Sequence, residues 1–244
     1  MVAKPTVGTF VNPSHALATG LSAAYLFNEG SGTTAADSSG NGEDMSLNGT
    51  YHTWTTTVCF TSGAALQAAL TAGTERGVIA PALPNIPGGA GFSIEWWLQD
   101  DGGDTYAALL SGSGNVGLKL NSNKLIWDQG TIYSSAGNVN ASTPYQLVLT
   151  YDLTNFRFYI NGTLDATVAS TNTIDTNPVN VFNDAGSETF KGIADLLRIW
   201  GNRVLNGTEV GDLYTTPFDM YSGSLVPHLE RQQRGVARGV KRGT

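Results

Sequence analysis

Apolar and polar residues alternate along residues 92–99 of this 244-residue chain, which read FSIEWWLQ. Successive side chains of an extended strand point to opposite faces, so Trp96 and Trp97 are expected on different faces. Residues 145–151 (YQLVLTY) and 156–160 (FRFYI) alternate in the same way. This pattern predicts strands that each bury one face in a core.

The dipeptide Asn161-Gly162 separates the last of these runs from another strand pattern at residues 163–168. Asn-Gly between two such patterns is a strong β-hairpin signal, because both residues tolerate positive φ. Further apolar runs are separated by turn signals at intervals of about 8–12 residues, as in all-β sandwiches. These runs predict strands at Ala23–Phe27, Leu66–Leu70, Gly77–Ala80, Ala107–Ser111, Val116–Leu120, Lys124–Asp128, Asn180–Phe182 and Gly192–Trp200.

The composition favours the same fold class. The chain is 41% hydrophobic and 14% charged, and it holds 30 glycines. Charged residues usually make up about 25% of a soluble domain. This mix disfavours a helical bundle and favours short strands joined by tight turns. We therefore expect an all-β protein, an antiparallel jelly-roll β-sandwich, with one short helical turn at Thr208–Tyr214.

Beyond Tyr221 the apolar pattern stops and an Arg/Gly-rich run follows. We expect an N-terminal extension at residues 1–14, one jelly-roll domain at 15–221 and an extended basic arm at 222–244. The net charge is −7, and five basic residues against one glutamate give residues 230–244 a charge of +4, which leaves −11 on the rest. The five basic residues are Arg231, Arg234, Arg238, Lys241 and Arg242.

Cysteine usage and hydropathy exclude several classes of protein. The single cysteine, Cys59, rules out an internal disulfide framework and a Cys-rich metal site. No run of about 18 apolar residues is present to span a membrane. The N-terminal sequence lacks the long apolar segment of a secretory signal. The chain is therefore expected to start in the cytosol that makes it, unless a leader has been removed.

The residues around Glu95 argue against glycoside hydrolysis. Such enzymes need two carboxylates held about 5–10 Å apart across the scissile bond. A second acid two positions along the strand would meet this spacing. Trp97 and Gln99 stand at the next two positions on that face. No Gly-x-Ser-x-Gly nucleophile elbow or phosphate-cradling loop is present either. We expect no enzymatic activity.

Five segments occur in a fixed order along the chain: GLSAAYLFNEGSG at residues 20–32, ADSSGNG at 36–42, FSIEWW at 92–97, YD and FYING within 151–162, and FKGIADLLRIW at 190–200. Together they resemble the laminin-G-like, concanavalin A-like jelly-roll family. The resemblance covers roughly residues 15–216, and it rests on the combination rather than on any one segment. It implies two packed antiparallel sheets.

The resemblance also implies a calcium site. The loop from Asp37 to Gly42 offers a carboxylate, an amide and backbone carbonyls, which are the oxygen ligands that calcium takes. In relatives, the acidic residue of the closing strand helps to bind the calcium ion, and this position is Asp195 here. The candidate ligands are therefore Asp37, Asn41 and Asp195. The alternative is a structural Asp/Asn turn, with Asp195 paired to Arg198. The sequence favours that alternative slightly.

Four aromatic residues are candidates for glycan binding, because a sugar's apolar face stacks on an exposed ring. Trp97 is expected to point away from Trp96, and Tyr106, Trp127 and Tyr133 lie nearby in the sequence. The alternative is that a loop covers these rings and makes them part of the core.

Residues 12–21 (NPSHALATGL) and 213–218 (LYTTPF) resemble versions of this domain encoded by tailed phages. This resemblance implies a non-enzymatic virion surface protein, either a head decoration protein or a head or tail fibre component. Such a protein is made in the host cytoplasm and released by lysis. The jelly roll would face outward and bind cell-surface glycans.

The basic arm is expected to dock on capsid or other virion proteins, or on a neighbouring copy of the chain, because arginine pairs well with carboxylates. Nucleic acid is a weaker expectation, since the acidic body repels phosphate. Two other functions remain open. One is a secreted bacterial carbohydrate-binding module, and the other is a jelly-roll glycoside hydrolase with an unrecognised acid pair.

Overall fold

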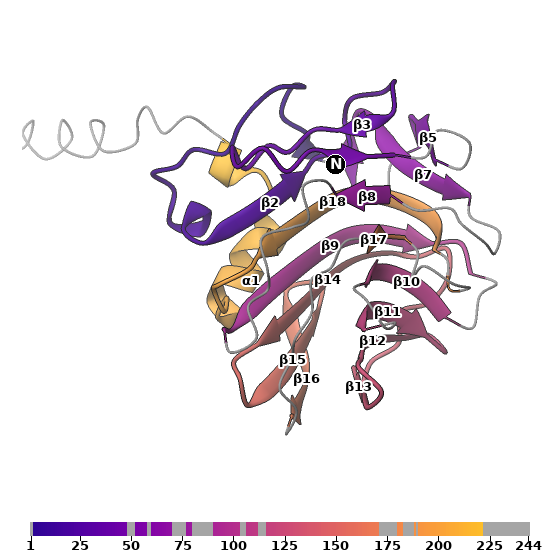
Figure 1. Ribbon diagram of the computed structural model, residues 1–244, viewed down its shortest axis with the longest axis vertical. Coiled ribbons are helices and arrows are strands. Elements are labelled where there is room, and N and C mark those ends of the chain that lie inside the picture. The colour runs from indigo at the N-terminus through magenta and orange to yellow at the C-terminus, as the bar shows by residue number, and fades with distance from the viewer. Residues whose placement is uncertain are drawn as a thin grey trace, which may run out of the picture.

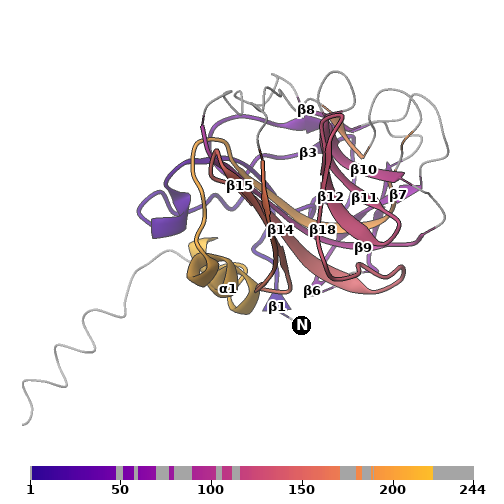
Figure 2. The same cartoon turned by 90° about the horizontal axis from the view of Figure 1, so that it is seen from below.

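Two antiparallel β-sheets stack face to face, as Figures 1 and 2 show. This confirms the jelly-roll β-sandwich predicted from the alternating runs. The basic arm at 222–244 and Cys59 lie outside the described residues. The computed structural model describes residues 2–47, 52–57, 60–69, 77–79, 90–102, 106–111, 116–170, 180–182, 188 and 190–221.

The strands form two long sheets and one short ribbon. In spatial order, the first sheet contains β13 (Ile132–Ser134), β12 (Lys124–Asp128), β11 (Gly117–Asn121), β10 (Tyr106–Ser111), β17 (Asn180–Val181), β8 (Gly77–Ile79), β4 (Met45–Ser46) and β3 (Thr34–Ala35). The second contains β16 (Thr163–Ala169), β15 (Asn155–Ile160), β14 (Pro144–Tyr151), β9 (Phe92–Asp100), β18 (Lys191–Trp200), β7 (Ala65–Ala69) and β5 (His52–Thr55), with β2 (Leu21–Tyr25) also paired to β18. The ribbon pairs β1 (Val2–Ala3) with β6 (Thr61–Ser62) in parallel. Each strand predicted from an apolar run is present, with its bounds shifted by no more than two residues.

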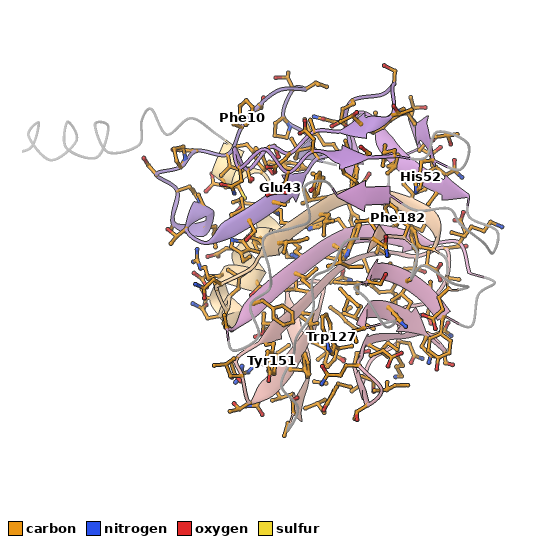
Figure 3. All side chains as sticks on the ribbon, viewed as in Figure 1. Phe10, Glu43, His52, Trp127, Tyr151 and Phe182 are labelled. Carbon is orange, nitrogen blue, oxygen red and sulfur yellow. The ribbon has the colours of Figure 1, made fainter. Side chains whose placement is uncertain are left out.

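The main core lies between the two sheets and is rich in aromatic rings. Alternate residues of β9 line it, as predicted, and Trp96 is the largest of them. The Trp96 ring lies 6.2 Å from the Phe27 ring and 5.3 Å from the Phe182 ring, measured between centroids. Figure 3 labels Phe182 together with Trp127 and Tyr151, which belong to the same core. Burial of these rings is a large favourable contribution to folding.

The outer face of the second sheet is covered as well. The alternation in β9 predicts a strand with one face exposed, whereas both of its faces are buried. Trp97 and Val148 pack in a second apolar cluster with α1 (Gly207–Thr215) and with the 3-10 helices η1 (Ala16–Ala18) and η3 (Asp219–Tyr221). Figures 1 and 2 place α1 on the side of this sheet that faces away from the first sheet.

A capping box starts α1. The Asn206 Oδ1 atom accepts hydrogen bonds from the N–H groups of Thr208 and Glu209, each 3.0 Å long, and Glu209 Oε2 accepts one from the Asn206 N–H at 2.9 Å. The sequence predicts that the helix begins at Thr208, but Asn206 is the N-cap because its side chain satisfies two free N–H groups. α1 and the other described helices are not long and apolar enough to cross a lipid bilayer.

The described part of the N-terminal segment packs on the sandwich. The sequence predicts an extension at residues 1–14, and the described residues of this segment contact the rest of the fold. Besides the β1 pairing, the Val11 N–H donates to the Ser38 carbonyl and the Asn12 N–H donates to the Met220 carbonyl, both at 2.8 Å. These hydrogen bonds tie the segment to the loop at Ser38 and to η3.

The hairpin between β15 and β16 has the predicted two-residue turn. Asn161 and Gly162 have φ angles of +50° and +77°, and Ile160 pairs directly with Thr163. Positive φ at both positions is the requirement that Asn-Gly meets. A Cβ on Gly162 would lie 2.8 Å from the Cβ of Tyr214. The glycine therefore permits both the turn and the close approach of α1.

Asp152 holds the turn between β14 and β15. Its Oδ1 atom accepts hydrogen bonds from the N–H groups of Thr154 (3.1 Å) and Asn155 (2.7 Å), and Arg157 Nη1 donates to its Oδ2 at 2.6 Å. Burial alone raises the pKa of the Asp152 carboxyl, but hydrogen bonds from Thr154 and Arg157 outweigh burial and hold that pKa well below its usual range.

We expect Asp152→Ala to lower the free energy of unfolding by about 1 kcal/mol at neutral pH, because the lost contacts are partly exposed. The pKa in the folded state lies below the unfolded value of about 3.9. The contribution of the carboxylate is therefore present above that pH and is lost as the pH falls through the folded pKa. Urea unfolding of both proteins at falling pH checks this. A difference that stays constant into strong acid would contradict it.

Candidate functional site

Three of the four aromatic rings predicted to stack on glycans are buried. Trp97, Trp127 and Tyr133 are only 4%, 1% and 5% exposed. The Trp97 ring packs edge-on to Phe60 on one side, and Trp127 and Tyr133 lie in the core between the sheets. The prediction of glycan stacking is wrong for these three residues, because protein atoms cover their rings.

The fourth ring, Tyr106, is half-buried at the start of β10 beside a buried cation. Lys119 Nζ lies 5.9 Å from the centre of the Tyr106 ring, 2.5 Å from Glu188 Oε2 and 3.2 Å from Asp128 Oδ2. Burial alone would lower the pKa of Lys119, but Glu188 and Asp128 outweigh it, so the net pKa is raised. Lys119 therefore stays charged, and glycan contact through Tyr106 stays a prediction.

The loop proposed for calcium is held by its own hydrogen bonds. Asp37 Oδ1 accepts from the N–H groups of Ala24 and Ser39, both at 2.9 Å, and its Oδ2 accepts from the N–H groups of Gly42 (3.1 Å) and Glu43 (3.2 Å). The Asp37 carboxylate thus serves four backbone donors. This arrangement is that of the structural turn.

The other two residues proposed for calcium also have protein partners. The Asn41 amide nitrogen donates to the Leu21 carbonyl at 2.9 Å. Asp195 is fully buried, with Lys4 Nζ 3.5 Å from its Oδ1 and the Phe60 N–H bonded to its Oδ2 at 2.8 Å. Lys4 thus supplies the positive charge beside Asp195, and the predicted Asp195–Arg198 pairing is wrong. As arranged, Asp37, Asn41 and Asp195 do not fit a calcium ion.

Arg198 pairs instead with Glu95, the acid on the central strand. Both side chains are fully buried, and Arg198 Nε lies 2.7 Å from Glu95 Oε2. The Trp97 indole N–H and the Gln146 amide donate to Glu95 Oε1, at 2.7 Å and 2.8 Å. Both carboxylate oxygens are therefore occupied. A carboxylate held in this way stabilises the fold and has no surface on which to meet a substrate.

A cleft of about 360 Å³ lies beside this buried pair, on the outer face of the second sheet. η1, α1 and η3 contribute its walls, and Arg198 is a fully buried member of its lining. Arg198 Nη1 donates to the Pro217 carbonyl at 2.9 Å and contacts the Met220 sulfur at 2.8 Å. Its Nη2 is also buried, and no atom of the described residues accepts a hydrogen bond from it.

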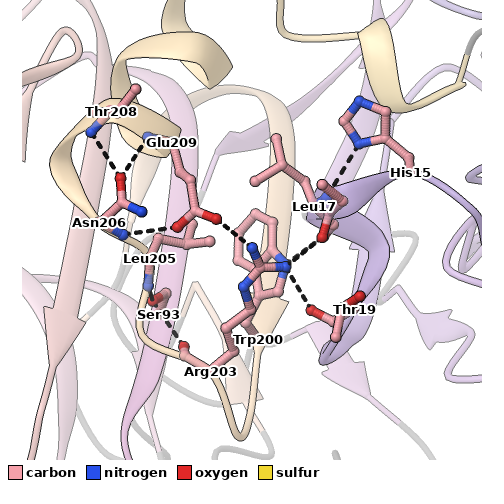
Figure 4. Close-up of polar contacts among 11 residues, drawn as sticks. His15, Leu17, Thr19, Ser93, Trp200, Arg203, Leu205, Asn206, Thr208 and Glu209 are labelled. Carbon is pink, nitrogen blue, oxygen red and sulfur yellow. Dashed lines mark hydrogen bonds and ion pairs between the residues drawn. The ribbon is translucent and has the colours of Figure 1, made fainter.

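Arg203 fixes the walls of the cleft relative to each other. Its Nη1 donates to the carbonyls of Ala16 (2.7 Å) and Thr19 (2.8 Å) around η1, and its Nη2 is paired with Glu209 on α1. The Trp200 indole N–H donates to the Leu17 carbonyl at 2.8 Å. Figure 4 shows these contacts side by side. The cleft is therefore a preformed feature of the fold.

One indirect signal for this site is present in the sequence. The closing strand, residues 191–200, carries Asp195 and Arg198 inside an otherwise apolar run, and charges in a buried strand need partners. The partners themselves come from distant segments, so the cleft could not be predicted. The basic residues proposed for docking, Arg231, Arg234, Arg238, Lys241 and Arg242, lie outside the described residues.

Solved structures of low sequence identity share this fold. Domain 4 of AbnA, a GH43 extracellular arabinanase from Geobacillus stearothermophilus solved with arabinotriose, aligns at a TM-score of 0.61 and 18% identity, over 80% of this chain and 98% of that one. The binding domain of Paraclostridial Mosquitocidal Protein 1 aligns at a TM-score of 0.64 and 17% identity, over 83% of this chain and 53% of that one. A Trypanosoma rangeli sialidase aligns at a TM-score of 0.57 and 14% identity, over 81% of this chain and 33% of that one. The chain thus spans about half of the toxin structure and a third of the sialidase.

No curated protein matches the sequence. The family profile described as the concanavalin A-like lectin/glucanases superfamily, Laminin_G_3, matches residues 72–211, which is more than half of the chain. This match confirms the family resemblance drawn from the five sequence segments. The chain belongs to the concanavalin A-like lectin/glucanase superfamily.

Proposed function

We propose that this jelly roll is a non-enzymatic recognition domain, displayed on a virion surface, which binds cell-surface glycans. The observation that carries the proposal is the state of Glu95. Glycoside hydrolysis needs carboxylates that reach the sugar, whereas Glu95 is fully buried and bonded to Arg198, Trp97 and Gln146. The network favours binding over turnover.

The two segments with the phage-type resemblance support display on a virion. Leu17 and Leu21 belong to the same apolar cluster as Leu213 and Phe218. Segments 196 residues apart in the chain are thus packed into one unit, from which the chain continues toward the basic arm. An acidic body joined to a basic arm suits docking on an acidic shell protein or on a neighbouring copy.

Deleting residues 222–244 tests the display. We expect the truncated chain to keep its melting temperature, since the described jelly roll ends at Tyr221, yet to be missing from purified particles. A second variant keeps the full length of the arm but loses its positive charge, and it should also be missing from purified particles. In it, five residues are changed to glutamine: Arg231, Arg234, Arg238, Lys241 and Arg242. Incorporation of the truncated chain at full occupancy would disprove the anchor.

A carbohydrate-binding module without a virion role is the second candidate. The likeness to the arabinanase domain, whose structure was solved with arabinotriose, favours it. Imaging of purified particles separates the two functions, because only a virion protein occupies a fixed position on them. A glycan array on the full chain tests the binding that both functions require.

A further inference from the structure

We propose that the cleft between η1, α1 and η3 binds a neutral, hydroxyl-rich ligand, namely a sugar residue of a glycan. The inference rests on the proposed glycan binding and assigns it a site. A site is needed because Trp97, Trp127 and Tyr133 are buried and cannot stack on a sugar.

Arg198 provides the first argument. Its side chain is fully buried, and Nη2 finds no acceptor among the described residues although Nε and Nη1 are both bonded. A buried donor without an acceptor costs free energy, and the cost is greater for a charged group. Because Arg198 lines the cleft, a ligand oxygen that enters the cleft can accept this hydrogen bond.

The carboxylates of the lining provide the second argument. Glu209 is already engaged by Arg203 and by the Asn206 N–H. Asp212 and Asp219 also line the cleft and are both exposed. No described residue donates a hydrogen bond to the Asp212 carboxylate, which can therefore accept one from a ligand. A ligand that fits this site therefore carries both a hydrogen-bond acceptor for Arg198 and a hydrogen-bond donor for Asp212.

The charge of the site selects among such ligands. Glu95 balances Arg198, Arg203 balances Glu209, and His15 Nε2 lies 3.5 Å from Asp219 Oδ2, so the Asp212 carboxylate leaves the cleft acidic. Anions such as phosphate or a sugar acid are repelled by this surplus. A hydroxyl group accepts from the guanidinium and donates to a carboxylate while remaining neutral.

The remaining walls suit the rest of a sugar ring. Leu17, Leu213 and Met220 form the apolar part of the lining and are 8%, 1% and 1% exposed, so Leu17 offers most of the apolar contact for the C–H face of a sugar. The volume of about 360 Å³ is at the lower end of ligand pockets, which span about 300–1,000 Å³. In the described part of the chain, no group of three or more histidine, cysteine or acidic side chains could hold a metal ion.

The test is an NMR titration of the full chain with methyl glycosides of glucose, galactose and arabinose. We expect shifts at the backbone amides of Leu17, Leu213 and Met220. Asp212→Ala should weaken binding by about tenfold, the loss expected when a hydrogen bond to a charged group is removed. Asp101→Ala, an equal change at an aspartate outside the cleft, should bind as the unmodified chain does. Methyl glucuronide should bind more weakly than methyl glucoside.

Each other outcome overturns the assignment. Chemical-shift changes confined to residues outside the cleft would place the glycan site elsewhere. So would glycan binding on an array that Asp212→Ala leaves intact. Either result leaves the proposed glycan-binding function standing. A synthetic peptide of residues 222–244 that shifts the cleft amides when none of the sugars does would make the basic arm the occupant. An array without any glycan signal would remove both the site and the function.

Discussion

Glu95→Gln is expected to lower the free energy of unfolding by about 3–5 kcal/mol, because it leaves the buried Arg198 guanidinium without its counter-charge. Both side chains are fully buried, and their closest atoms are 2.7 Å apart. Glutamine keeps the size and one acceptor oxygen of glutamate, so the variant removes the charge with little change in packing. Urea unfolding of the variant and the unmodified chain measures the difference.

Two controls isolate the buried pair. Arg157→Gln breaks the partly exposed pair with Asp152 and should cost about 1 kcal/mol or less. The double variant Glu95→Leu with Arg198→Met removes both charges and should recover much of the lost stability. A cost below about 1 kcal/mol for Glu95→Gln would mean that Glu95 is hydrated rather than buried, and it would reopen a catalytic role for this acid.

Trp96→Ala is expected to cost about 3–5 kcal/mol, the range measured for the loss of large buried aromatic side chains. Trp96 lies on β9 between the two sheets and is fully buried, with Phe27 and Phe182 against its ring. Alanine would leave a cavity that the sheets cannot close without shifting their strands. Chemical unfolding followed by fluorescence gives the difference.

Trp96→Phe separates ring volume from hydrogen bonding at this position. The Trp96 indole nitrogen is buried and has no hydrogen-bond partner within the described ranges. Replacing the indole with a phenyl ring should therefore cost clearly less than Trp96→Ala, since the ring is mostly retained. Phe10→Ala, at a ring that is 61% exposed and labelled in Figure 3, should change stability little. Equal losses for Trp96→Ala and Phe10→Ala would contradict the two-sheet core.

Local patterns predicted the strands because strand formation depends on near neighbours. The alternation at residues 92–99 gave the core-facing side of β9, and Asn161-Gly162 gave the hairpin with positive φ at both positions. The start of α1 was predicted one residue late, at Thr208 instead of Gly207, and the residue that caps it, Asn206, was missed. The capping function of Asn206 depends on its backbone conformation, which the side-chain pattern does not reveal.

Contacts between distant segments explain the predictions that were wrong. Trp97 is on the predicted face of β9, but α1 and η3, more than 100 residues later in the chain, cover that face. Arg198 and Asp195 are close in sequence and have different partners, Glu95 and Lys4. Spacing along one strand cannot specify such pairs. The cleft depends on the same long-range packing and was missed for the same reason.

The most direct test of a recognition domain that binds without turnover is to recover the glycan after binding. The full chain is incubated with a polysaccharide that slows its migration in affinity electrophoresis. The polysaccharide is then examined by mass spectrometry. The proposed function predicts that the bound polysaccharide keeps its length, since Glu95 is occupied by Arg198. New reducing ends that accumulate with time and disappear after heat denaturation of the protein would contradict it.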